Sequence, residues 1–391
     1  MTHKRTFLLI TILLIMLAAC NTEPEATPTP EPPATAVPPQ PEPEPTEPAP
    51  QMADGVVISE MLPGIEGNNL YEFIELYNGG DTAVDLNGWS LWYRIGPDRD
   101  EELVAAWDTE TLVPPAGHYL LLHEGQDFDI VPDAVFTASM SPRKGGLALR
   151  DPDGNVVDAF GWGEAPDGFV TGAAAIPAAN ASLERLPGGD LGNGQATGSN
   201  ADDLAANSAP SPQNSGSPLT PAPDKSLALA WTMPEVVTPG EIFGVEMTVN
   251  NQTGEAVTDV LVSAPVSANF VVAEMPEGAE LADGRVQWTI PQIEADGSAT
   301  AVVSLQAPYT YVDTLMHNAF AQADGLLAVF APPQTITMAG GAIPIANARE
   351  LVGSTVSVEG IATMYTGGFF AGSTGAKFYL EDESGGIQVY V

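Results

Sequence analysis

The sequence predicts an all-β protein with two β-sandwiches in tandem. Short apolar runs broken by Gly, Pro, Asn and Asp recur from about residue 55, a pattern typical of strands and turns. In one run Phe243, Val245 and Met247 alternate with polar or small residues, as on a strand with one buried face. The pair Asp153-Gly154 lies between two apolar runs and indicates a hairpin turn, because both residues tolerate positive φ.

The first folded region begins near Gly55, and its apolar runs lack the 3.6-residue period of a helix. The predicted strands are Val56 to Met61, Tyr71 to Tyr77, Trp89 to Arg94, His118 to His123, Gly146 to Arg150 and Asn155 to Phe160. Six or more short strands over this length favour a sandwich.

Several motifs of this region resemble the lamin tail domain as found in secreted bacterial proteins. They are Ile58-Ser59-Glu60, Tyr71 to Asn78, Asp85 to Leu91, Leu147 to Gly163 and Ser182-Leu183-Glu184-Arg185. Ser211-Pro212-Gln213-Asn214 is similar to the terminal motif but has Gln where Gly is usual. The resemblance covers residues 54–215 and implies an immunoglobulin-like (Ig-like) sandwich without catalytic residues.

A linker at residues 216–224 separates this region from a second one, residues 225–335. Its apolar residues again alternate, in Leu227, Leu229, Trp231 and in Val286, Trp288, Ile290. Turn residues such as Asp283-Gly284 and Asp296-Gly297 separate the runs. We therefore expect a second Ig-like sandwich, of the kind repeated in bacterial surface and adhesin proteins.

Residues 336–391 resemble the front of an OB-fold, like modules that accompany secreted nucleases. The resemblance rests on Val356 to Ile361, Phe378 to Asp382 and Gly385 to Val389, after a short predicted helix at Ile345 to Leu351. About three of the five strands of such a barrel are present. Because the chain ends inside a strand at Val391, we expect a truncated module.

The N-terminus carries a basic start, His3-Lys4-Arg5, followed by an apolar run from Phe7 to Ala19. This run is too short for a membrane-spanning helix and predicts a secretory signal peptide over residues 1–20. Leu17-Ala18-Ala19-Cys20 resembles the lipobox of bacterial lipoproteins, which implies cleavage before Cys20 and a lipid anchor on the cell membrane or surface. The alternative is an ordinary signal peptide cut elsewhere.

Residues 21–53 are dominated by Pro, Glu, Thr and Ala and have no apolar periodicity. Such a composition cannot build a core and predicts a disordered stalk. As an extended polyproline II segment it would reach up to roughly 100 Å, at ~3.1 Å per residue.

The overall composition limits the classes of function. The chain has 391 residues and a single cysteine, so no disulfide forms within it. Its 51 acidic and 12 basic residues give a net charge of −39, which repels polyanions and makes nucleic-acid binding by this chain unfavourable. We expect no cofactor and no bound metal.

Two local motifs invite chemical interpretations. Ser141-Pro142-Arg143-Lys144 has the Ser-x-x-Lys spacing of serine acylases, but it lies in a predicted loop without the helix such a pair needs. Asp151, Asp153, Asn155 and Asp158 form an oxygen-rich run that suggests calcium, yet the spacing is not that of an EF-hand. A hairpin turn is the favoured interpretation, and calcium stays open.

The histidines do not predict a zinc site or a catalytic triad. His118 and His123 are an odd number of residues apart and so point to opposite faces of one strand, while His317 stands alone. We expect all three at the surface or at strand edges.

Glu60, Glu72 and Glu75 lie within predicted strands, where a buried charge needs a partner. We predict that Arg185 pairs with Glu72 or Glu75 as a structural clasp. The competing interpretation is an acid/base pair in a glycosidase-like cleft, with carboxyls about 5 to 10 Å apart.

Together these patterns predict a noncatalytic lipoprotein whose sandwiches serve adhesion, display or binding of a protein or polysaccharide. The alternative is the targeting and substrate-binding part of a longer secreted nuclease or phosphoesterase. For that function the candidate base-stacking aromatics are Tyr365, Phe369, Phe370, Tyr379 and Tyr390. The oligomeric state is not predicted.

Overall fold

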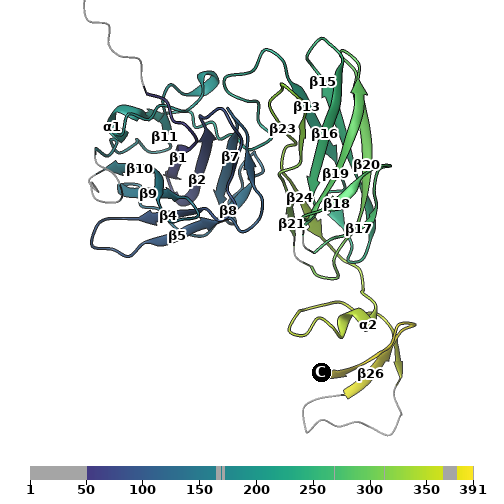
Figure 1. Ribbon diagram of the computed structural model, residues 1–391. Helices are drawn as coiled ribbons and strands as arrows, with labels where there is room; N and C mark the ends of the chain where they lie inside the picture. Colours follow the sequence, from purple (N-terminus) through teal and green to yellow (C-terminus); the bar gives the residue numbers. More distant parts are fainter. Residues whose placement is uncertain are drawn as a thin grey trace, which may run out of the picture. The chain divides into compact units, whose positions relative to one another are not determined.

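The computed structural model describes residues 51–163, 169, 172–267, 269–311, 313–363 and 377–390. All of these belong to one compact unit, Ala49–Val391. Strands dominate, and the predicted all-β class with two sandwiches is confirmed (Figure 1). None of the helices in the described ranges is long and apolar enough to cross a membrane.

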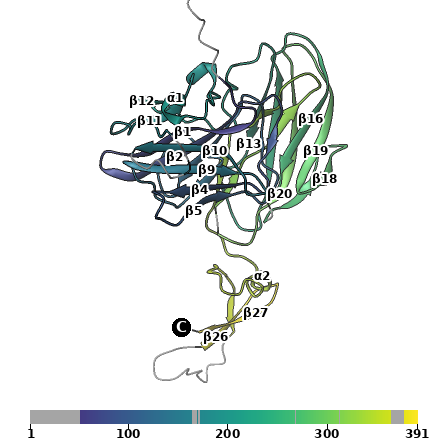
Figure 2. The same cartoon turned by 60° about the vertical axis from the view of Figure 1, so that its left-hand side comes forward.

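The first sandwich has a six-stranded sheet of order β12-β11-β1-β2-β7-β8 and a four-stranded sheet of order β10-β9-β4-β5. Figure 2 labels β12, β11, β1 and β2 of the first sheet and β10, β9, β4 and β5 of the second. The six strands are β1 (Val56–Ile65), β2 (Asn68–Asn78), β7 (His118–His123), β8 (Ala134–Phe136), β11 (Ser182–Arg185) and β12 (Leu204–Asn207). The four are β4 (Ser90–Arg94), β5 (Glu102–Ala106), β9 (Lys144–Arg150) and β10 (Val156–Gly163). The short β3 (Val84–Asp85) pairs with β6 (Leu112–Val113), and η1 (Gly189–Leu191) and α1 (Asn200–Asp203) precede β12.

Two apolar clusters hold this sandwich. Ile74 and Leu76 of β2 face the core between the sheets, together with Phe160 and Trp162 of β10. Phe73, which precedes Ile74, belongs to a smaller cluster on the outer face of the six-stranded sheet. All six residues of β7 are buried, so this strand is covered on both faces. The predicted hairpin at Asp153-Gly154 joins β9 to β10.

The second sandwich has sheets of order β13-β15-β20-β17, β18-β19-β16-β22-β23 and β14-β24-β21. Its strands are β13 (Leu227–Thr232), β14 (Val236–Val237), β15 (Ile242–Asn251), β16 (Val257–Pro265), β17 (Val271–Glu274), β18 (Glu280–Ala282), β19 (Arg285–Ile293), β20 (Ser298–Gln306), β21 (Thr314–Met316), β22 (Phe320–Gln322), β23 (Val329–Phe330) and β24 (Gln334–Met338). The predicted alternation is confirmed in β15, where Phe243, Val245 and Met247 are buried and Ile242 is exposed.

The last described part contains α2 (Ile345–Ala348), which is shorter than the predicted helix, and an antiparallel sheet of β25 (Ile361–Thr363), β26 (Lys377–Glu381) and β27 (Gly386–Tyr390). The Asp382 carboxylate ties the two together, because it accepts hydrogen bonds from the N–H of Ile345 and of Ser384. These bonds, with the Ser384 hydroxyl contributing most, lower the pKa of Asp382 to about 2. The OB-fold itself stays a prediction.

Candidate functional site

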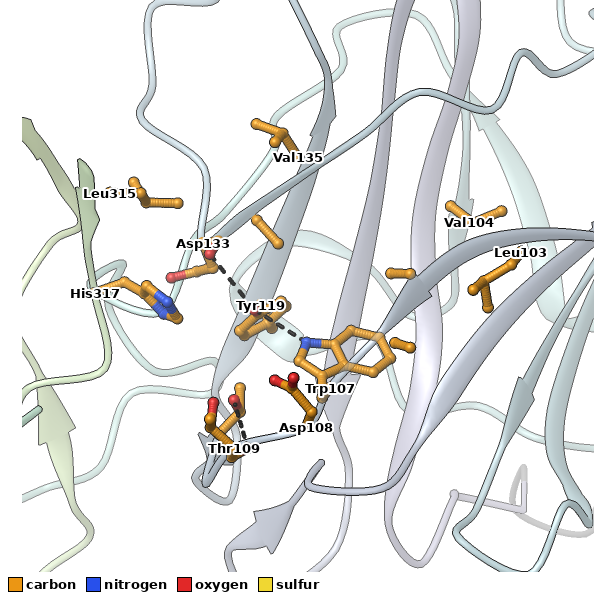
Figure 3. A pocket seen from close by; sticks show the side chains of 14 residues that line it. Leu103, Val104, Trp107, Asp108, Thr109, Tyr119, Asp133, Val135, Leu315 and His317 are labelled. Atoms are coloured by element: carbon orange, nitrogen blue, oxygen red, sulfur yellow. Dashed lines mark hydrogen bonds between the residues drawn. The ribbon is translucent and has the colours of Figure 1, made fainter. Parts of the chain in front are cut away.

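The first candidate site is a hollow of about 470 Å³, called here the Trp107 hollow (Figure 3). It is lined by β5 and the residues after it, including Trp107, Asp108 and Thr109, by Tyr119 of β7, and by Leu315 and His317. Aromatic, aliphatic and polar groups are mixed in this lining.

Two aromatic residues fix the wall of the Trp107 hollow. The indole Nε1 of Trp107 donates to the Tyr119 hydroxyl at 3.1 Å, and the two rings meet edge to face. The Tyr119 hydroxyl lies 3.4 Å from the carbonyl oxygen of Asp133 (Figure 3). Burial, and then the Asp133 charge, raise the pKa of Tyr119 well above its ordinary value. The phenol therefore stays protonated and serves as scaffold.

His317 gives the Trp107 hollow its imidazole. Burial, and then the charge of Arg285, lower the pKa of His317 to about 4, so the ring is neutral near pH 7. Its Nδ1 is buried and has no hydrogen-bond partner among the described residues. His317 directly follows β21, the edge strand of its sheet, and is half-buried, in keeping with the predicted surface or strand-edge position. Its ring stands edge-on to Tyr119. A neutral imidazole without a partner carboxylate lacks the orienting group of a general base, so the ring is available at most as a hydrogen-bonding group.

Asp133 borders the Trp107 hollow but is committed to the fold. Its carboxylate accepts hydrogen bonds from the N–H of Leu120 at 2.8 Å, the N–H of Ser215 at 2.9 Å and the Ser215 hydroxyl. Burial raises the pKa of Asp133 to about 7, and these bonds partly oppose the rise. Asp133 thus ties Ser215 to the outer face of the six-stranded sheet.

The segment of residues 208–223, called here the covering segment, is held by a buried polar cluster. The Glu75 carboxylate lies 2.9 Å from Nδ1 of His118, and Nε2 of His118 lies 2.7 Å from the Thr220 hydroxyl. Glu75 also accepts hydrogen bonds from the Ser59 hydroxyl at 2.6 Å and the Gln213 N–H at 2.6 Å. Glu75 is therefore bound on both sides of its carboxylate.

The order of hydroxyl, imidazole and carboxylate in this cluster is that of a catalytic triad. However, Thr220 is 6% exposed and His118 1% exposed, and the Thr220 carbonyl accepts a hydrogen bond from Tyr77. No substrate reaches a hydroxyl in that position. The arrangement fastens the covering segment, and the acid/base interpretation gains no support at Glu75.

The surface or strand-edge prediction is wrong for His118 and His123. Both are buried. His118 is covered on the outer face of the sheet by Thr220 of the covering segment. His123 packs edge to face against Phe136, and its Nδ1 lies 3.0 Å from the carbonyl oxygen of Glu124.

The predicted clasp partners of Arg185 are wrong. Arg185 is 1% exposed, and its guanidinium binds Asp158 at 2.9 Å, with Asp203 at 3.9 Å. It also donates to the carbonyl oxygens of Ile58 and Gln195 at 2.8 Å each. The residue is a buried clasp, as predicted, but it joins β11 to β10 and not to Glu72 or Glu75 of β2.

Glu72 and Glu60 are buried carboxyls with different surroundings. One oxygen of Glu72 accepts a hydrogen bond from the Met140 N–H at 2.9 Å, and Oε2 has no partner among the described residues. Glu60 bonds the Ser182 hydroxyl and lies opposite Glu75 in the β1–β2 ladder. Burial raises the pKa of each to about 8, assisted at Glu60 by the Glu75 charge. Neither lines the Trp107 hollow.

The two motifs singled out in the sequence are structural turns. The Asn155 side-chain amide, and then the N–H groups of Asn155 and Asp153, donate hydrogen bonds to the Asp151 carboxylate and lower its pKa. The Asp158 carboxylate does not join Asp151, Asp153 and Asn155, because it pairs with Arg185. Within the described ranges no cluster of His, Cys, Asp or Glu could hold a metal ion. Ser141 donates its N–H to the Tyr93 hydroxyl, and Lys144 begins β9.

A second hollow of about 410 Å³ lies on the outer face of the six-stranded sheet and is called here the Tyr71 hollow. Its lining includes Leu62, Tyr71, Phe73, Phe128 and Asp129. The rings of Tyr71 and Phe128 stack with centroids 3.9 Å apart. Sequence reasoning missed this site, although Phe128 and Ile130 inside the acidic run of residues 124–133 were a signal for it.

Some predicted site residues lie outside the described residues. They are Cys20, Tyr365, Phe369 and Phe370. Tyr379 and Tyr390 lie in β26 and β27, with exposed fractions of 40% and 62%.

Comparison with known families supports the first sandwich. Residues 49–164 match the model of the Lamin Tail Domain family, which confirms the predicted resemblance over these residues. β11 and β12 lie beyond the matched residues but belong to the same sheet. No curated protein matches the chain in sequence.

Several solved structures align with part of this chain. The CARDB domain of the PF1109 protein from Pyrococcus furiosus is 13% identical, with 29% of this chain and 89% of that chain covered and a TM-score of 0.22. A cohesin module of a Clostridium perfringens family 33 glycoside hydrolase is 12% identical, covering 29% and 99%, with a TM-score of 0.23. The chitin-binding domain of Chi18aC from Streptomyces coelicolor is 15% identical, covering 26% and 97%, with a TM-score of 0.20.

Proposed function

We propose that this chain is a noncatalytic, lipid-anchored protein of a bacterial cell surface that binds a partner through its β-sandwiches. The observation that carries the proposal is the use of the buried ionisable groups. Glu75, His118 and Asp133 fasten the covering segment, and Arg185 joins two strands. In a hydrolase such groups would face a cleft, whereas here they make hydrogen bonds and ion pairs that hold the fold together.

The anchor is proposed from Cys20 and the apolar run before it. A lipid on this cysteine, followed by the Pro-rich stalk, would hold the sandwiches away from the membrane. The acidic surface keeps such modules soluble and steers cationic partners toward them.

The proposal is tested by producing the full chain and the Cys20→Ser variant in a bacterium fed an alkyne-labelled fatty acid. We expect label on the wild type alone, and digestion of the folded modules when intact cells are treated with protease. An unlabelled wild-type protein in the cytosol would remove the anchor from the proposal. Turnover of a polysaccharide or phosphoester by the purified full chain would remove its noncatalytic character.

The alternative function, a binding part of a longer nuclease, is favoured by one observation. Tyr379 and Tyr390 are exposed on the C-terminal sheet, and the Lys377 ammonium lies 5.8 Å from the Tyr390 ring centre. Aromatic side chains beside a cation can stack on single-stranded nucleic acid. Fluorescence anisotropy with a labelled oligothymidine tests it, and at a net charge of −39 we expect no binding at physiological salt.

A further inference from the structure

The Tyr71 hollow combines an apolar floor with an aromatic wall. Leu62 and Phe73 of the floor are almost fully buried, and the Phe73 ring meets Phe128 edge to face at 6.3 Å. Tyr71 stacks on Phe128 and is half-buried. At about 410 Å³ the hollow falls within the range of ligand clefts and is wide enough for a long side chain.

The rim of this hollow is acidic. Asp129 lines it, Asp127 lies two residues away, and both are exposed. Burial, and then the charges of Asp129 and Asp127, raise the pKa of Tyr71. The loop of residues 124–133 contains no Lys or Arg. The other polar residue in the lining is Asn180, whose side-chain oxygen accepts the Glu66 N–H.

This combination selects among ligand classes by charge. An anion is repelled by the acidic rim and by the net negative charge of the chain. A purely apolar group makes no favourable interaction with the rim carboxylates. A long cationic side chain satisfies both parts, since its methylene stem packs on apolar surface while its charged end meets aromatic faces and carboxylates.

We propose that the Tyr71 hollow binds a lysine or arginine side chain of a basic polypeptide partner. The stem lies against Phe128 and against Ile65, which also lines the hollow, and the cation is held by Asp129 and the electron-rich aromatic wall. The proposal deepens the binding function proposed above by naming the partner's chemistry. The two proposals are tested independently, because fatty-acid labelling of Cys20 does not depend on this hollow.

The test is isothermal titration calorimetry of the full chain, in detergent, with tetralysine, with its fully acetylated and therefore neutral form, and with chitotetraose. Variants Asp129→Asn and Tyr71→Leu alter the hollow. Glu280→Gln removes an equal charge from an exposed site on the second sandwich and is the matched control for Asp129→Asn. Because Asp129 is exposed, its variant tests the proposal even where Tyr71→Leu unfolds the sheet face.

We expect tetralysine to bind and the acetylated peptide not to bind. Asp129→Asn and Tyr71→Leu each weaken the affinity about fivefold, as an exposed cation–π or ion contact implies, whereas Glu280→Gln leaves it within about twofold. Equal losses in Asp129→Asn and Glu280→Gln would show diffuse charge attraction and overturn the proposal. Binding of chitotetraose without binding of tetralysine would overturn it in favour of a saccharide ligand.

Discussion

At the scale of single residues, the molecule depends on buried charges whose partners the sequence only partly reveals. The burial of Glu60, Glu72 and Glu75 was predictable from their apolar neighbours on the strands. The Asp158 partner of Arg185 was not, because the β9–β10 pairing has an irregularity between Val156 and Asp158. Such a bulge re-aims side chains, so simple alternation along the strand does not place Asp158.

Replacing Arg185 by Met should strongly destabilise the first sandwich. The change leaves the largely buried Asp158, whose side chain is 12% exposed, without its cation, which costs ~3–5 kcal/mol of unfolding free energy. Differential scanning calorimetry of the full chain measures this as a lowered Tm. Arg143→Met, in an exposed loop, is the control and should shift Tm little. Equal shifts in the two variants would contradict the clasp.

Glu72→Gln should alter the pH dependence of stability. A carboxyl whose pKa is raised from 4.5 to about 8 keeps its proton in the folded state while the unfolded chain loses it. Its contribution is complete below about pH 4.5 and is lost as pH rises toward 8, by up to ~1.4 kcal/mol per pH unit.

We therefore expect the difference in unfolding free energy between Glu72→Gln and wild type to shift in favour of the variant from pH 4.5 to pH 8. Urea titrations monitored by tryptophan fluorescence measure it, with the exposed Glu280→Gln as control. A difference that is independent of pH would show that Glu72 has an ordinary pKa.

At the scale of elements, the covering segment is the least predictable part of the fold. The alternation in β15 predicts one buried and one exposed face, and the structure follows it. Residues 208–223 carry no such pattern, and their position depends on hydrogen bonds to Glu75, His118 and Asp133. These hydrogen bonds join residues that are separated by 82 to 138 positions in the sequence, so they leave no local sequence pattern.

Thr220→Val should loosen the covering segment. The variant keeps the shape of the side chain but leaves Nε2 of buried His118 without its hydroxyl partner, at a cost of about 1–3 kcal/mol. Hydrogen–deuterium exchange should become faster in residues 208–223 and stay unchanged in β15. Thr289→Val on an exposed position of β19 is the control. If exchange in the covering segment stays unchanged, the hydrogen bond between Thr220 and His118 does not hold this segment in place.

At the scale of the whole molecule, the net charge of −39 opposes compaction through self-repulsion. Added salt screens this repulsion, since the Debye length falls from ~30 Å at 0.01 M to ~3 Å at 1 M. We expect the Tm of the full chain to rise between 10 mM and 500 mM NaCl. Equal concentrations of KCl and NaCl should give equal shifts, and a Tm that falls with salt would contradict repulsion as the main long-range electrostatic effect.

The most direct test of the account is the intact mass of the protein extracted from bacterial membranes. A mature chain that begins at Cys20 and carries acyl chains on that residue is the expected result, and it fits a tethered binding protein. A chain cut at another residue, or one that retains residues 1–19 and bears no lipid, would contradict the claim that these sandwiches are displayed from a lipid anchor.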